Sequence, residues 1–305
     1  CKEKNKGKTL AVTVDDGCTT NLSDYIKHNN SEISFNNSEN WIVLNPIELS
    51  IKKKIEEHGT KLEDWDLSIN RGILTGYNDA FIIDEATKNS LIESDSRSAE
   101  LIRPILRGKD IKRYTYNFAN LYLICTFPSK HYDIDKYPAI RDYLLSFDKR
   151  RLAQTGEKDI DGIKGFNARK KTANKWFETQ DQINYSDDFM KQKLIWTPVN
   201  SEYKFTIIPE GYFFNNSIFM ITGEDLYYLC GILNSNLYQK YFEMVFTNGS
   251  YNYGSAASIK KLPIIDLPKN IHDEIRDTVK IILSENKMEL CSRIDELIYS
   301  QIKIK

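Results

Sequence analysis

The sequence predicts an α+β fold, with a mixed-sheet domain, flanking helices and a C-terminal amphipathic helical segment. Short apolar runs between turn residues indicate strands in the middle of the chain, and apolar residues at helical spacing indicate helices elsewhere. The elements alternate irregularly and no internal repeat occurs, which favours α+β over a doubly wound sheet. Hydrophobic residues make up 41% and charged residues 28% of the 305 residues, as in globular domains, so extensive disorder is not expected.

The first part of the chain, residues 1–70, is expected to be a connector. A lysine-rich lead and a polar stretch rich in Asn and Ser accompany two short strands expected at 10–14 and 41–44. A helix is expected over 47–58, because isoleucines recur there at every fourth position and a glycine follows as a stop.

The central region is expected to consist mainly of strands. Residues 72–84 (GILTGYNDAFIID) predict a strand, a turn and a second strand. A helix is expected at 137–152, followed by a flexible basic loop that extends to residue 175. The other strands are expected at 101–106, 110–114, 121–127, 193–197, 204–208 and 212–221.

The last third of the chain is expected to be mostly helical. Leucines at helical spacing predict a helix over 224–246, and a strand-like run follows at 259–265. Residues 271–304 predict one long or two short amphipathic helices. Their apolar stripe is expected to close the domain's own core, with docking on another domain or on a second subunit as the alternatives.

The sequence lacks the motifs of common enzyme sites. It contains no Walker-type phosphate loop, no dinucleotide fingerprint and no Gly-x-Ser-x-Gly elbow. The four histidines have no metal-ligand spacing, and the five scattered cysteines indicate reduced thiols in a cytoplasmic protein. No apolar run approaches the roughly 20 residues that span a bilayer, so no membrane partner is expected. Nuclease-like fragments at Asp110-Ile-Lys112 and Glu285-Asn-Lys287 are common by chance in so charged a chain, and they leave a stand-alone nuclease as a weak alternative.

Two basic clusters suggest contacts with a polyanion, although the net charge is only −1. The first surrounds a turn at Gly108, and a solvated rim explains it equally well. The second lies within 149–175, where nine Lys or Arg accompany three acidic residues and three Gly; its alternative is an ordinary solvated loop. The candidate phosphate contacts of the two clusters are Arg107, Lys109, Lys112, Arg113, Lys164, Arg169, Lys170, Lys171 and Lys175.

A third candidate is the loop NGSYNYGS at 248–255. An Asn amide can form two hydrogen bonds with the edge of adenine, and a tyrosine can stack or pack against a sugar. A loop supported by a helix and a strand can aim such side chains. The expected base-reading residues are therefore Asn248, Tyr251, Asn252 and Tyr253. The alternative is a glycine-rich turn whose tyrosines cover the neighbouring core.

Seven blocks of sequence occur in one particular order. They are GILTGYNDAFIID (72–84), LIRPILRGKDIKRY (101–114), WFETQ (176–180), DFMKQKLIW (188–196), residues 211–242, IKKLPI (259–264) and RIDELIYSQI (293–302). In this order they resemble the C-terminal specificity domain of TaqI-type adenine-specific DNA methyltransferases and of type IIG restriction–modification enzymes. The resemblance implies a target-recognition domain at 71–268 that binds double-stranded DNA, a connector at 1–70 from an upstream methyltransferase domain, and a C-terminal helical segment at 269–305.

The catalytic motif of those methyltransferases, Asn-Pro-Pro-Tyr or Asn-Pro-Pro-Phe, does not occur in the chain. Its eight prolines include no Pro-Pro pair, the S-adenosylmethionine motif is also missing, and the first residue is Cys1. We therefore expect a non-catalytic piece of a longer adenine-specific methyltransferase, with or without endonuclease activity. Its partners would be double-stranded DNA and the catalytic domain of the same polypeptide.

The expected cofactors belong to the parent enzyme and not to this piece. They are S-adenosylmethionine and, where a nuclease domain is present, Mg²⁺. An alternative from another class is a protein–protein interaction module that uses the aromatic surface and the terminal helix. The 18 tyrosines and 14 phenylalanines suit either interface, and they also suit the strands of a half-buried sheet.

Overall fold

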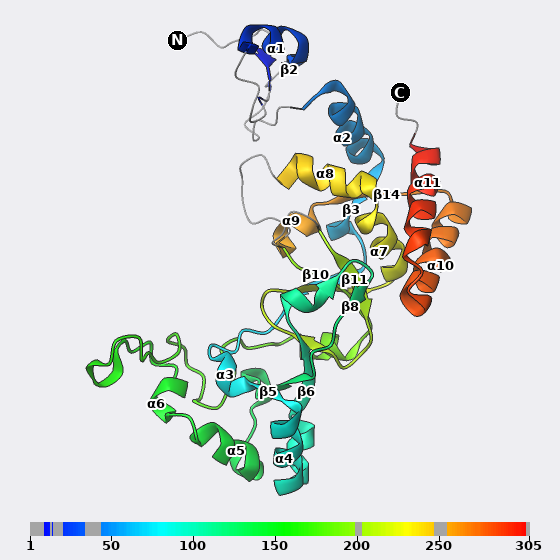
Figure 1. Ribbon diagram of the computed structural model, residues 1–305. Coiled ribbons are helices and arrows are strands. Elements are labelled where there is room, and N and C mark those ends of the chain that lie inside the picture. The colour runs from blue at the N-terminus through cyan, green and yellow to red at the C-terminus, as the bar shows by residue number, and fades with distance from the viewer. Residues whose placement is uncertain are drawn as a thin grey trace. The chain divides into compact units, whose positions relative to one another are not determined.

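The computed structural model describes residues 9–12, 14, 21–33, 44–198, 203–246 and 255–302. The chain divides into two compact units, whose elements are labelled in Figure 1. We call residues 66–200 and 204–226 the sheet unit. We call residues 1–65, 201–203 and 227–305 the helical unit.

Two four-stranded sheets form the frame of the sheet unit. The first is antiparallel and has the order β11-β10-β13-β4, with the strands Phe205–Ile208, Lys193–Trp196, Phe219–Gly223 and Leu67–Arg71. The second has the order β12-β6-β9-β5, with the strands Phe213–Phe214, Ile102–Leu106, Leu121–Ile124 and Ile82–Asp84. Because β12 runs parallel to β6 while the other pairs are antiparallel, this sheet is mixed. The predicted α+β class with a mixed sheet is confirmed.

The core of the sheet unit is built from aliphatic and aromatic side chains of both sheets. Every residue of β10 and β11 is buried, and the rings of Phe189 and Phe213 stack 4.6 Å apart. Among its described residues the unit also contains the helices α3 (Asn78–Phe81), α4 (Glu85–Ser94), α5 (Pro138–Leu145) and α6 (Lys149–Leu152). A short pair, β7 (Ile111–Lys112) with β8 (Thr115–Tyr116), completes the unit.

The strand–turn–strand predicted for 72–84 is wrong in its first arm. Ile73 forms only an isolated bridge with Asn215. The Thr75 hydroxyl donates a hydrogen bond to the Asn78 side chain over 2.7 Å, and Gly76 has a φ of +77°. This turn leads into α3, so only β5 forms a strand here.

Two other long elements predicted for this unit are interrupted. The predicted helix at 137–152 is divided into α5 and α6, because the Asp148 side chain accepts a hydrogen bond from the Arg150 amide and starts a new helix. The predicted strand at 212–221 is divided into β12 and β13 by a turn, in which the Ile218 amide donates to the Asn215 carbonyl.

The helical unit begins with the pair β1 (Thr9–Ala11) and β2 (Ser31–Ile33), joined through α1 (Leu22–Asn29). Helix α2 (Pro46–His58) confirms the helix predicted at 47–58, and a capping box between Asn45 and Glu48 fixes its start. Ile51 and Ile55 are buried. Strand β3 (Gly59–Lys61) then pairs with the distant β14 (Pro263–Ile265), which follows α9 (Ala256–Lys260). Of the strand expected at 41–44, residues 41–43 lie outside the described part of the chain.

The helix predicted at 224–246 is two helices, α7 (Leu226–Asn234) and α8 (Asn236–Phe246). Ser235 separates them, because its hydroxyl donates to the Ile232 carbonyl and accepts from the Tyr238 amide. The hydroxyl of Tyr238 also accepts a hydrogen bond from the Ile265 amide over 2.9 Å, which attaches α8 to β14.

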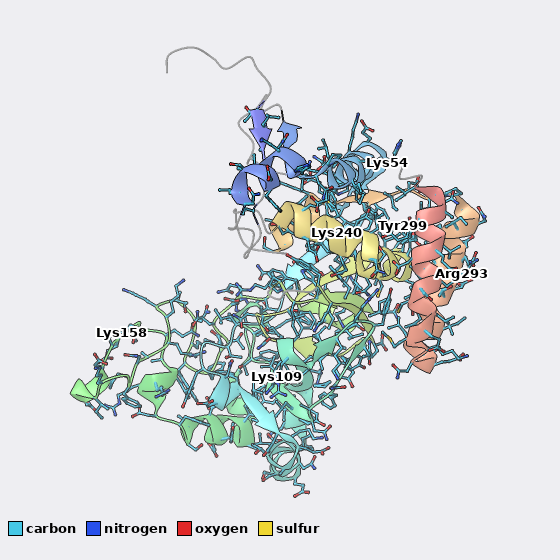
Figure 2. The ribbon with its side chains drawn as sticks, turned by 45° about the horizontal axis from the view of Figure 1, so that its top comes forward. Lys54, Lys109, Lys158, Lys240, Arg293 and Tyr299 are labelled. Carbon is cyan, nitrogen blue, oxygen red and sulfur yellow. The ribbon has the colours of Figure 1, made fainter. Side chains whose placement is uncertain are left out.

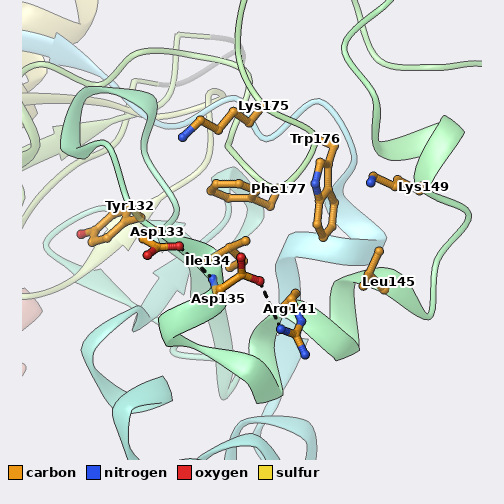
Figure 3. Close-up of a pocket in the computed structure, with 10 residues that line it drawn as sticks. All are labelled: Tyr132, Asp133, Ile134, Asp135, Arg141, Leu145, Lys149, Lys175, Trp176 and Phe177. Atoms are coloured by element: carbon orange, nitrogen blue, oxygen red, sulfur yellow. Dashed lines mark hydrogen bonds and ion pairs between the residues drawn. The ribbon is translucent and has the colours of Figure 1, made fainter.

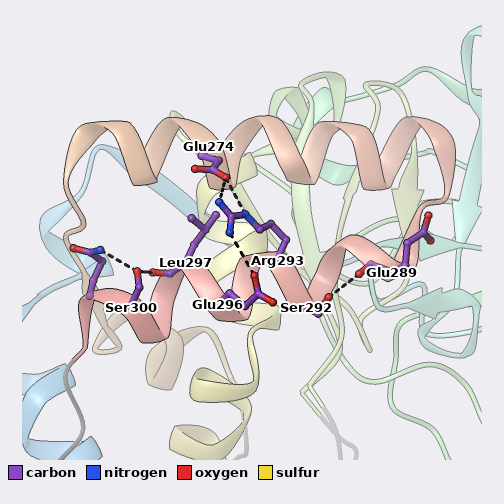
Figure 4. A network of polar contacts seen from close by, with 8 residues as sticks. Glu274, Glu289, Ser292, Arg293, Glu296, Leu297 and Ser300 are labelled. Carbon is purple, nitrogen blue, oxygen red and sulfur yellow. Dashed lines mark hydrogen bonds and ion pairs between the residues drawn. The ribbon is translucent and has the colours of Figure 1, made fainter.

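Two amphipathic helices, α10 (Lys269–Glu285) and α11 (Cys291–Gln301), end the described chain, and Asn286 in the left-handed conformation separates them. Their apolar stripe is buried within this unit. Figure 4 shows that Arg293 of α11 joins the two helices through Glu274 of α10, with a shortest N–O distance of 2.7 Å. No helix in the described part of the chain is long and apolar enough to cross a membrane.

The compact units do not coincide with the functional division expected from the sequence. Residues 227–268 cluster with 1–65 and with the terminal helices, mainly because β14 pairs with β3. The functional division at 70 and 268 therefore stays a prediction.

Candidate nucleic-acid interface

The basic segment 149–175 contains a hairpin-like projection, residues 153–172, which we call the finger. Its two legs are joined by backbone hydrogen bonds, from the Gly156 amide to the Arg169 carbonyl over 2.9 Å and from the Ala168 amide to the Glu157 carbonyl over 3.0 Å. In Figure 1 the segment after α6 extends away from the sheets of its own unit. The flexible loop expected from the sequence is thus a hydrogen-bonded element.

Arg169 fixes the base of the finger. Only 3% of its surface is exposed, and its guanidinium donates hydrogen bonds to four backbone carbonyls. These belong to Leu152, Thr75, Glu178 and Trp176, at distances between 2.7 and 2.8 Å. Burial lowers the pKa of Arg169 to about 10, against a smaller opposing effect of the Glu178 carboxylate. The expectation that Arg169 offers a surface cation is therefore wrong, because its donors are already occupied inside the protein.

Gln154 provides a second attachment at the base of the finger. Its amide nitrogen donates to the carbonyls of Glu178 and Thr179, and its amide oxygen accepts from the Thr172 hydroxyl over 2.6 Å. The Glu178 carboxylate in turn accepts a hydrogen bond from the Lys175 amide over 2.6 Å. Buried polar groups are stabilised by such partners. These hydrogen bonds attach the base of the finger to the segment 175–179.

The lysines of the basic segment occupy a different environment from Arg169. Lys158, Lys164, Lys170 and Lys171 are exposed, and within the described part of the chain none of them forms an ion pair. Lys175 is also exposed, with its ammonium 5.5 Å from the centre of the Phe177 ring. Exposed ammonium groups without acidic partners are available to phosphate oxygens. The predicted Lys164, Lys170 and Lys171 thus lie on the finger, and Lys175 follows it in the chain.

The arginines before the finger are engaged within the protein. Arg150 pairs with Asp148 at 2.7 Å and with Asp161 at 2.6 Å. The guanidinium of Arg151 lies 4.5 Å from the centre of the Tyr77 ring. The pair between Arg150 and Asp161 joins α6 to the finger, and the lysines remain the accessible cations of the finger.

The other basic cluster forms a turn around Gly108. Arg107 donates from Nε and Nη2 to the two oxygens of the buried Asp110, over 3.0 and 2.9 Å, and this hydrogen bonding raises the pKa of Arg107. Arg107 therefore builds the turn, and Asp110 is not a free carboxylate of the nuclease type. Lys109 and Lys112 are exposed beside it, whereas Arg113 is half-buried.

A pocket of about 420 Å³ adjoins the basic segment, and Figure 3 shows its lining. The Lys149 ammonium lies 5.3 Å from the centre of the Trp176 ring. Asp135 pairs with Arg141 at 3.1 Å, so charges of both signs are present. The partly exposed ring of Trp176 lies beside a lysine, and such a ring can stack on a nucleic-acid base.

Sequence reasoning missed the residues that support the finger. Thr75, Gln154 and Glu178 bind the base of the finger, yet each is an ordinary polar residue in a polar stretch. A side chain added at Gly76 would lie 2.9 Å from the Arg169 side chain, so the family-like Thr-Gly block makes room for this support. Thr75 and Glu178 lie in two of the sequence blocks that resemble the specificity domain, so the sequence could have singled them out. It could not have shown which residues they contact.

The third predicted site cannot be placed. Asn248, Tyr251, Asn252 and Tyr253 lie outside the described residues, and their role in reading bases stays a prediction. In the part of the chain that is described, no group of three or more His, Cys, Asp or Glu could hold a metal ion.

Comparison with known proteins identifies a family. The model of the TaqI-like C-terminal specificity domain matches residues 103–264, more than half of the chain. The type II methyltransferase M.MjaIV of Methanocaldococcus jannaschii is 24% identical over 228 residues, which cover 70% of this chain and 68% of M.MjaIV.

Two solved structures are also similar. The type IIL restriction–modification enzyme MmeI, solved in complex with DNA, has a TM-score of 0.54 at 14% identity over 81% of this chain and 34% of that one, so the two share a fold. The type IIG restriction endonuclease BpuSI has a TM-score of 0.46 at 15% identity over 85% of this chain and 32% of that one. The chain spans about a third of the length of these two solved chains.

Proposed function

The chain belongs to the family of TaqI-like C-terminal specificity domains, and from that premise we propose that it recognises a DNA target for an adenine-specific methyltransferase or a fused restriction–modification enzyme. The family match carries this proposal, because it spans both basic clusters and the predicted base-reading loop. The relative M.MjaIV is itself a type II methyltransferase, which supports the same parent class.

The surface lysines suit the phosphate-binding part of this function. Each lysine that neutralises a phosphate releases counterions, so binding weakens as salt rises. Phosphate contacts fix the protein on the duplex but carry no sequence information, which must come from side chains that reach base edges. We assign the first task to Lys164, Lys170, Lys171 and Lys175, and leave the second with the loop at 248–255.

The chemistry is assigned to the rest of the parent polypeptide. S-adenosylmethionine would bind a catalytic domain that carries the Asn-Pro-Pro-Tyr motif, and Mg²⁺ would serve a nuclease domain where one is present. The specificity domain would place one adenine for extrusion from the duplex and methyl transfer to its exocyclic amine. Double-stranded DNA and the catalytic domain are thus its proposed partners.

Salt-dependent binding of the 305-residue chain to a fluorescent 30-base-pair duplex tests the phosphate contacts. The triple variant Lys164→Gln, Lys170→Gln, Lys171→Gln should lower the slope of log affinity against log salt by up to about 2.7, since each phosphate contact in B-DNA contributes about 0.9.

A control variant must remove the same charge elsewhere. Lys53, Lys280 and Lys287 are exposed lysines of the helical unit, and their triple change to Gln should alter the slope far less. Equal slopes for the wild type and the finger variant would contradict the assignment of phosphate contacts. No binding of any duplex by the folded chain would contradict DNA recognition itself.

A further inference from the structure

The tip of the finger, residues 158–165, exposes a large apolar side chain. Ile163 has 57% of its surface exposed. Ile160, three positions earlier, has only 2% exposed and is part of the buried core. Lys158 and Lys164 flank Ile163 in the sequence and are exposed as well. Figure 2 shows Lys158 on the part of the finger that extends from its unit. The tip therefore presents an exposed isoleucine and two exposed lysines.

The conformation of the tip is held by its own hydrogen bonds. The Asp159 carboxylate accepts from the Gly165 amide over 2.7 Å, and its carbonyl accepts from the Gly162 amide over 2.8 Å. The Phe166 amide donates to the Ile163 carbonyl over 3.0 Å. Gly162 and Gly165 have φ values of +75° and +82°, which glycine adopts without strain. Because these bonds order the tip in advance, exposure of Ile163 is not a result of a loose loop.

Three acidic residues lie on the finger together with five basic residues, so the finger as a whole keeps a formal charge of +2. Asp161 is paired with Arg150 at 2.6 Å. The Asp159 carboxylate accepts the Gly165 amide, which orients this carboxylate and leaves its negative charge in place. Glu157 is exposed on the leg, where its backbone pairs with Ala168. The cations beside Ile163 thus remain free of ion pairs within the described residues.

We propose that the finger enters the minor groove of the bound duplex and presses Ile163 between two adjacent base pairs as an apolar wedge. Lys158 and Lys164 would contact phosphates on either side of the groove. An isolated apolar side chain gains nothing from a phosphate, but it can replace part of the stacking at a flexible base step and kink the duplex. A step that unstacks easily would then be favoured without any base-edge contact. This inference rests on the proposed DNA recognition and adds a specificity-determining residue to it.

Fluorescence of 2-aminopurine tests the wedge, because this base brightens when it is unstacked. The probes are duplexes that the 305-residue chain retains from a randomised library, resynthesised with 2-aminopurine at successive positions. Wild type should brighten the probe at one step. Ile163→Ala should remove most of that signal and weaken binding about tenfold, whereas Ile163→Phe should keep both.

Two further variants make the result decisive. Ile163→Lys removes the apolar wedge but adds a cation, so it should lose the fluorescence signal while binding more tightly than Ile163→Ala. Met190→Ala, which changes an apolar side chain that is 50% exposed outside the finger, should behave as wild type. Wild-type signal and affinity in Ile163→Ala would overturn the wedge and leave DNA recognition intact. Failure of wild type to bind any duplex would overturn both.

Discussion

Replacement of Arg169 by Met should destabilise the sheet unit, whereas the same change at the adjacent Lys170 should not. Arg169 is 3% exposed and donates to four carbonyls at the base of the finger. Methionine keeps much of the apolar packing but provides no donor. Three buried carbonyls and one partly buried carbonyl would then lose a charged partner.

The expected cost follows from two opposing terms. A hydrogen bond from a charged group contributes about 1.5–3 kcal/mol, so four of them set an upper bound of roughly 6–12 kcal/mol. Burial of the guanidinium opposes this gain, as its pKa lowered to about 10 indicates. Each buried carbonyl left without a donor costs about 1–3 kcal/mol, and the methionine removes the cost of burying a charge, so a net loss of about 3–5 kcal/mol is reasonable. We expect that cost for Arg169→Met, against about 0.5 kcal/mol or less for Lys170→Met.

Urea unfolding of the full chain, followed by hydrogen exchange of peptides from the sheet unit, measures both variants. Exchange should accelerate at Gly156 and Ala168 in Arg169→Met, because their amides join the legs of the finger. Equal stability of the two variants would refute the structural role of Arg169. So would a loss of DNA affinity in Arg169→Met without any loss of stability.

Three further outcomes are expected. Burial lowers the pKa of Lys193 to about 8. Above that pH the unfolded chain therefore binds more protons than the folded chain. The free energy of unfolding should rise by about 2 kcal/mol between pH 7 and 9.5. Paired urea titrations should show this rise missing in Lys193→Met. Gly72→Ala should cost about 1–3 kcal/mol by thermal unfolding, since its Cβ would lie 2.1 Å from the Asn215 carbonyl oxygen. Tyr238→Phe removes a hydroxyl that bonds two backbone groups of β14, and it should cost about 1–3 kcal/mol in urea.

Local sequence signals predicted several elements correctly. Isoleucine spacing and the glycine stop predicted α2, whereas the capping box of Asn45 and Glu48 was found only in the structure. The strand predicted at 121–127 contains β9. The break between α7 and α8 was missed, although Ser235 between two asparagines is a capping signal that apolar periodicity overrode.

The site was harder to predict, because the sequence does not show which cations of a basic run face the protein. Arg169, Lys170 and Lys171 are consecutive, yet only Arg169 is buried. Its partners lie as far as 94 positions away, at Thr75. The chemistry of arginine offered a clue, since a planar fork of donors suits several carbonyls at once and an ammonium does not. The exposed lysines were predictable as charges but not as members of a hydrogen-bonded finger.

The most direct test of the role as a specificity domain is to select, from a pool of random duplexes, those that the 305-residue chain binds. Duplexes with a randomised centre would be captured on the immobilised chain at physiological salt, amplified and sequenced over several rounds. Recognition of a target predicts enrichment of one short sequence that contains an adenine, with mismatches that each cost about 1–3 kcal/mol. A retained pool with the same sequence distribution as the input, from a chain that is folded, would contradict the account.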